Sequence, residues 1–179
     1  MFTIASFEFR SRLKLISTWV YFLVFFALVM LWMAAAGGLF EGANVSFGSG
    51  KVAINSPYAL AATTSVLGMF GTVVMAAIMG RAVQQDFEYR TSTFFFAAPI
   101  GKAQYLGGRF LGALGVVLLV FTSIALGAWC ATFLPGMDAT RIGANRLAAY
   151  ALPLATMLLP NALLIGGLFF SLAALTRRM

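Results

Sequence analysis

Four long runs without a charged side chain constrain what this sequence can fold into. About 20 residues of α-helix, at a rise of 1.5 Å per residue, cross the roughly 30 Å hydrocarbon core of a bilayer. Only 9% of the residues are charged, whereas soluble domains have about 25%. We therefore predict an all-α polytopic membrane protein that forms a single transmembrane domain over residues 1–179, with four spans at about residues 18–38, 57–80, 108–134 and 147–176.

The segment before the first span, residues 1–16, has the period of an amphipathic helix. Its apolar residues recur three or four positions apart and so share one stripe: Phe2, Ala5, Phe9, Leu13 and Ile16. Arg10 and Lys14 fall opposite this stripe. Glu8 and Arg12 lie at its flanks. We expect an in-plane helix in the headgroup region, with its apolar side toward the lipid; a plain charged lead-in to the first span is the alternative.

The fourth run contains two prolines that we expect to bend it. Its thirty residues would form a helix about 45 Å long, which exceeds the bilayer core. We expect Pro153 and Pro160 to accommodate the excess length of this helix, either by kinking it or by splitting off a short interfacial helix.

The basic residues predict the orientation of the chain, because Lys and Arg concentrate in cytoplasmic loops. With the amino terminus inside, the outer side holds only three of the twelve, Lys51, Arg141 and Arg146. The cytoplasmic side holds nine: Arg10, Arg12, Lys14, Arg81, Arg90, Lys102, Arg109, Arg177 and Arg178. Both termini and the loop at residues 81–107 are therefore expected in the cytoplasm.

The residue types present exclude several function classes. The chain has no histidine and one cysteine, Cys130, so we expect no catalytic site, no metal site, no cofactor and no enzymatic activity. The net charge of +7 is spread between apolar runs, which favours membrane topology over binding to nucleic acid. No Asp, Glu, Lys, Arg or His lies inside the four apolar runs, the third of which begins at Phe110, and this argues against an ion-coupled carrier.

The loop at residues 81–107 is the most promising functional segment. Thr91 can cap a short helix that Pro99 must end, and between them lie Ser92, Thr93, Phe94, Phe95 and Phe96. Three consecutive phenylalanines need burial, either in a groove of a protein partner or at the lipid surface. Asp86 and Glu88 are expected to form salt bridges with Arg81, Arg90 or the amino-terminal helix.

This pattern resembles the permease subunits of bacterial ABC-2-type exporters. The likeness is closest to permeases fused, further downstream, to a zinc aminopeptidase-like domain. It extends over the whole chain through short motifs, of which the longest is P-I-x-K-x-x-Y-L-x-G-R-F-x-G. Here that motif consists of Pro99, Ile100, Lys102, Tyr105, Leu106, Gly108, Arg109, Phe110 and Gly112.

The resemblance implies a location, a function and partners. In this family the loop between the second and third spans carries a coupling helix, here Thr91 to Pro99, which docks into a separate ATP-binding subunit. The resemblance also implies that the chain is a bacterial inner-membrane permease, which pairs with a second permease copy or half within the lipid bilayer. Family members have six spans, so a four-span chain is expected to be an amino-terminal fragment. Gly108, Gly112 and Gly115 would let helices slide; the alternative function is a non-transporting membrane scaffold.

Overall fold

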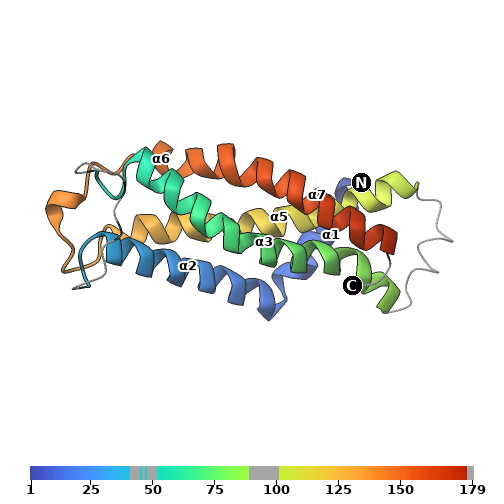
Figure 1. The fold of residues 1–179 in the computed structure, drawn as a ribbon. Coiled ribbons are helices and arrows are strands. Elements are labelled where there is room, and N and C mark those ends of the chain that lie inside the picture. The colour runs from blue at the N-terminus through green and yellow to red at the C-terminus, as the bar shows by residue number, and fades with distance from the viewer. Residues whose placement is uncertain (41–44, 46, 48–51, 89–100, 177–179) are drawn as a thin grey trace. The chain divides into compact units, whose positions relative to one another are not determined.

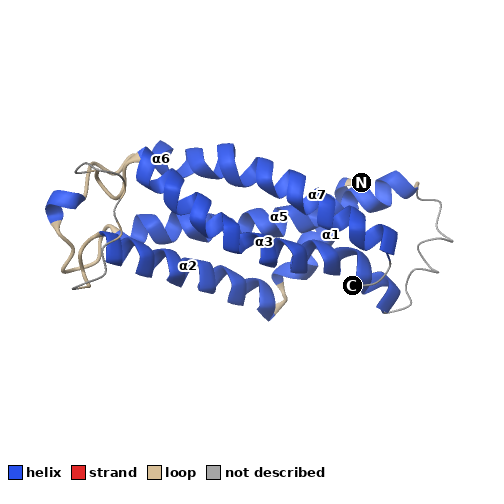
Figure 2. Ribbon diagram, in the orientation of Figure 1, coloured by secondary structure: helices blue, strands red, loops and turns tan. Residues whose placement is uncertain are grey.

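The computed structural model describes residues 1–40, 45, 47, 52–88 and 101–176, and every regular element in this part of the chain is helical (Figures 1 and 2). The elements in chain order are α1 (Phe2–Leu13), α2 (Ile16–Ala36), α3 (Pro57–Glu88), α5 (Lys102–Ala131), the short 3-10 helix η1 (Ala139–Arg141), α6 (Leu147–Pro153), the π-helical turn η2 (Leu154–Leu158) and α7 (Leu159–Thr176).

Four of the helical stretches are long and apolar enough to cross a membrane: Ile16–Ala36, Pro57–Gln85, Lys102–Ala131 and Leu147–Thr176. Their outward surfaces carry large apolar side chains such as Leu23, Met69 and Leu164. In water such surfaces would be unstable, whereas lipid solvates them without cost. The described part of the chain is therefore an all-α membrane protein with four candidate spans, as the sequence predicts.

The second and third spans extend beyond their expected ends. Helix α3 continues eight residues past Gly80, to Glu88, and α5 begins at Lys102 rather than at residue 108. The expected loop at residues 81–107 is thus helical at both ends. Residues 81–88 contain neither Gly nor Pro, and Arg, Ala, Gln and Glu are good helix formers. Charged side chains mark the edge of the membrane and not the end of a helix.

The amino-terminal segment forms α1, as expected, and the residues that it buries come from the flanks of the apolar stripe. Glu8 and Arg12 are the buried residues of this helix. By contrast, Phe2 from the expected stripe is 79% exposed. The last stripe residue, Ile16, belongs to α2 and not to the amino-terminal helix.

The fourth span stays helical from Leu147 to Thr176 but changes its hydrogen-bond register before Pro160. Proline has no N–H, so an α-helix cannot bond the carbonyl four residues earlier. In the π-helical turn, the N–H of Leu159 donates to the carbonyl of Leu154, five residues back. This turn lies between Pro153 and Pro160, the two residues at which the sequence predicts a change in the helix.

The chain divides into two compact units. The first comprises residues 1–19, 71–119 and 161–179. In its core, the rings of Phe110 on α5 and Phe170 on α7 meet edge to face, with centroids 5.4 Å apart. A Cβ at Gly166 of α7 would lie 3.0 Å from the Cε of Met79. The small residue therefore lets α7 approach α3 closely.

The second unit comprises residues 20–70 and 120–160. Phe25 of α2 and Phe121 of α5 meet edge to face with centroids 5.8 Å apart. A Cβ at Gly127 of α5 would lie 2.2 Å from a methyl carbon of Val29 and 3.0 Å from the carbonyl oxygen of Phe26. Only glycine fits this contact between α2 and α5.

Candidate functional site

A buried ionic cluster in the first unit joins helices that are far apart in sequence. Glu8 of α1 is 3% exposed and accepts hydrogen bonds through both carboxylate oxygens. One oxygen lies 2.5 Å from the Nε of Arg12, one turn along the same helix. The other is bound by Nη1 of Arg109 on α5. Burial of a carboxylate requires such pairing, because a lone buried charge is strongly unfavourable.

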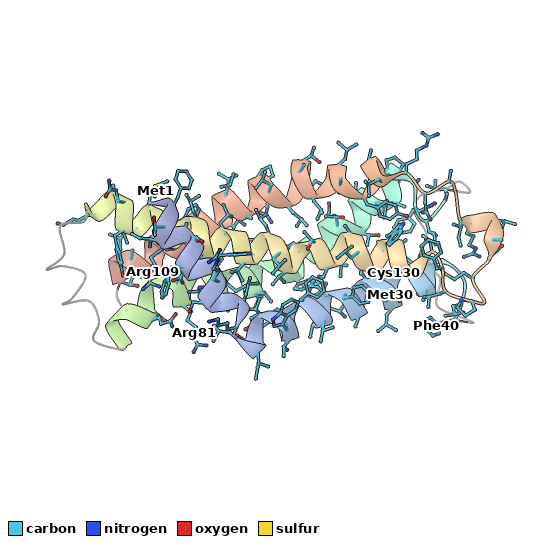
Figure 3. All side chains as sticks on the ribbon, turned by 180° about the vertical axis from the view of Figure 1, so that it is seen from behind. Met1, Met30, Phe40, Arg81, Arg109 and Cys130 are labelled. Atoms are coloured by element: carbon cyan, nitrogen blue, oxygen red, sulfur yellow. The ribbon has the colours of Figure 1, made fainter. Side chains whose placement is uncertain are left out.

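Arg12 extends the cluster to a third helix. Its Nη1 donates to the carbonyl oxygen of Ile78 on α3, at 3.2 Å. Its Nη2 is buried and has no hydrogen-bond partner. The charged side chains of α1 thus hold α3 and α5 together, and we name Glu8, Arg12 and Arg109 the ionic cluster. Figure 3 shows Met1, at the start of α1, beside the part of α5 that carries Arg109.

A stripe of glycines on α5 forms the surface on which α1 rests. A Cβ at Gly108 would lie 2.8 Å from the Cβ of Ile4, and one at Gly112 would lie 2.6 Å from the Cβ of Glu8. A Cβ at Gly115 would lie 3.1 Å from the ring of Phe9. The spacing of four and three residues puts all three glycines on one face of α5. The close approach of the two helices brings Glu8 within reach of Arg109.

The sequence also predicts roles for several charged residues in and beside the loop at residues 81–107. Arg81 is exposed on α3, and Lys102 is exposed at the start of α5. The guanidinium carbon of Arg109 lies 5.7 Å from the centroid of the Tyr105 ring. Asp86 and Glu88 are on the last turns of α3, but their side chains lie outside the described part of the structure. The same holds for Arg90 and for the expected coupling helix, Thr91 to Pro99, whose roles remain predictions.

The sequence analysis noted Glu8 and Arg12 only as flanking residues. Two signals could have singled them out. They are an oppositely charged pair four residues apart, a spacing that brings side chains together on a helix. Glu8 is also one of only five acidic residues in the chain. The partner Arg109 is 101 positions away, which no local pattern reveals.

The second unit contains a polar cluster centred on Asn55, two residues before the start of α3. The Asn55 amide nitrogen donates to the carbonyl of Gly143 at 2.7 Å, and its oxygen accepts from the Gly143 N–H at 2.8 Å. The same nitrogen donates to Asn145, which bonds in turn to Thr132 and to the hydroxyl of Tyr150. Asn55 is 3% exposed, so these hydrogen bonds replace the ones that its amide group would make to water in the unfolded chain.

We expect Asn55→Ala to destabilise the protein by about 1–3 kcal/mol, because it removes the two hydrogen bonds to Gly143, each worth about 0.5–1.5 kcal/mol. Thermal denaturation of the detergent-solubilised protein measures this loss. Thr156→Ala is the control, since its hydroxyl is exposed and bonds only to Leu152 of its own helix. Equal melting temperatures for both variants would contradict a structural role for the Asn55 cluster.

The loop before α6 caps the ends of two helices. The carboxylate of Asp138 accepts from the N–H and the hydroxyl of Thr140, at 3.0 and 2.7 Å. These hydrogen bonds, the hydroxyl first, lower the pKa of Asp138 below its usual value. Arg141 donates to the carbonyl of Ala36 at the end of α2, and the Arg141 carbonyl accepts from the N–H of Ile54. The first of these two contacts satisfies a backbone carbonyl that the end of α2 leaves free.

Among the described residues, no three His, Cys, Asp or Glu side chains are grouped so as to hold a metal ion. Comparison with protein-family models, with curated proteins and with solved structures gives no match. The fold therefore defines what is established: this is a multi-pass, all-α membrane protein with four candidate spans.

Proposed function

We propose that the chain is the membrane-spanning permease subunit of an ABC-2-type exporter, which couples ATP hydrolysis on a partner subunit to movement of substrate. The carrying observation is the sequence pattern from Pro99 to Gly112, which resembles the entry to the third span of that family. In this proposal the partner docks on Thr91 to Pro99, a second permease copy completes the transporter, and both termini are cytoplasmic.

The contacts within the first unit connect the start of α5 to α1 and α3, and this supports the proposed coupling. The residues of the pattern that open α5, from Lys102 to Gly112, include both Arg109 and two of the glycines that contact α1. A force applied to the loop before Lys102 would act on α5 and, through the ionic cluster, on α1 and α3. Coupling of this kind needs packed elements that move together.

The test is co-purification of an ATP-binding subunit with the tagged chain from its native membrane. We expect Phe95→Asp with Phe96→Asp to abolish this association, because two carboxylates cannot enter an apolar docking groove. The matched control is Phe40→Asp with Phe133→Asp, which makes the same chemical change in loops assigned to the opposite side of the membrane.

Two results would contradict the proposal. If the ATP-binding subunit stays bound to the Phe95 and Phe96 variant, docking occurs elsewhere. If the wild-type chain recovers no ATP-binding subunit but does recover other membrane proteins, the scaffold function takes its place.

A further inference from the structure

The outward face of α1 combines aromatic and basic side chains. Phe7 is 70% exposed. Arg10 and Lys14, three and seven residues further on, are exposed on the same side of the helix. The inward side, by contrast, buries the charged pair of Glu8 and Arg12. A face that places an exposed aromatic ring beside two cations is suited to a membrane surface rather than to water alone.

The connection to α2 keeps this face near the bilayer surface. Helix α1 ends at Leu13, and the first candidate span begins at Ile16, a connection that reaches no more than about 11 Å when extended. The Trp19 indole N–H donates to the carbonyl of Leu13 at 2.9 Å, and the Thr18 hydroxyl donates to that of Arg12 at 2.8 Å. Both bonds hold the end of α1 against the first turn of the span.

We propose that the outward face of α1, formed by Phe7, Arg10 and Lys14, binds anionic phospholipid headgroups. Aromatic rings enter the boundary between headgroups and acyl chains, while Arg and Lys extend their charged ends to the phosphates. Charge complementarity selects the occupant, since the two exposed cations favour an anionic surface over a neutral one. The inference requires only the membrane span that follows α1 and does not depend on the transporter proposal.

The experiment measures binding of phosphatidylglycerol to the whole detergent-solubilised chain, in excess phosphatidylcholine, by native mass spectrometry. We expect Arg10→Gln with Lys14→Gln to weaken phosphatidylglycerol binding roughly tenfold or more, at about 1 kcal/mol for each cation near a membrane surface. Binding of phosphatidylcholine should stay unchanged. The control, Lys51→Gln with Arg146→Gln, removes the same charge from loops beyond the first and third spans and should retain wild-type affinity.

Each outcome decides for or against the proposal. Loss of phosphatidylglycerol affinity in the α1 variant alone, with an unchanged melting temperature, supports it. Equal affinity in wild type and α1 variant overturns it, as does an equal loss in the control, which would show a response to net charge only. If the α1 variant keeps its lipid but loses a bound protein, the face is a protein interface instead.

Discussion

Gly112→Leu should detach α1 from α5. A Cβ at this position would lie 2.6 Å from the Cβ of Glu8 and 2.8 Å from the carbonyl oxygen of Ala5. Because the second atom belongs to the backbone, a change of rotamer cannot relieve the overlap, and the helix itself must move. Overpacking of this kind costs about 3 kcal/mol, roughly a hundredfold in the docking equilibrium. We expect faster tryptic cleavage at Arg10 and Lys14, together with a lower melting temperature.

Gly167→Leu is the matched control for this experiment. It makes the same substitution on α7, where no atom lies within 4 Å of the added Cβ. The control should keep both the wild-type melting temperature and the wild-type cleavage rate. Cleavage of α1 at the same rate in wild type and Gly112→Leu would show that α1 does not rest on the glycine stripe.

Glu8→Ala should destabilise the first unit by about 3–5 kcal/mol, the usual effect of removing one partner from a buried ion pair. The substitution removes the carboxylate that both Arg12 and Arg109 bind. Both guanidiniums then lose a charged partner in a place that water does not reach. Thermal or denaturant unfolding in detergent gives the magnitude, and Glu8→Gln separates the loss of charge from the loss of packing.

A double-mutant cycle tests whether the pairing across helices causes this effect. Glu8→Ala combined with Arg109→Leu should lose clearly less stability than the two single variants together, because each single change already removes the Glu8–Arg109 ion pair and the loss of that pair is counted only once in the double variant. Additivity within about 0.5 kcal/mol would mean that the two residues act independently. The cluster would then have no role in joining α1 to α5.

The spans could be predicted because their signal is local and strong. In lipid the backbone of an apolar run must satisfy its own hydrogen bonds, as a helix does, and the charge-free run at residues 147–176 is helical from Leu147 to Thr176. The ends of α3 and α5 were missed for a physical reason. A helix satisfies its own backbone hydrogen bonds in lipid and in water alike, so α3 passes Arg81 and continues to Glu88.

The inward face of α1 could not be predicted from its own residues. Periodicity groups the apolar side chains on one stripe, which was expected to face the lipid, but it does not show which of the other residues contact the protein. The structure buries Glu8, because Arg109 and the glycines of α5 offer it a charged partner and a close approach. The preferred face of this helix is therefore a property of the tertiary structure. The loop that motivated the transporter proposal, Thr91 to Pro99, lies beyond what the structure describes.

The bond between Glu8 and Arg109 has a consequence for the synthesis of the protein. The two residues are 101 positions apart, and a ribosome adds about 5–20 residues per second. Arg109 is therefore made roughly 5–20 seconds after Glu8. During that interval the nascent α1 has its internal partner, Arg12, but not yet the glycine surface of α5. Helix α1 is therefore translated first but reaches its final position only after α5 has been made. Until then, a membrane insertase or chaperone would meet α1 with its charged face not yet buried.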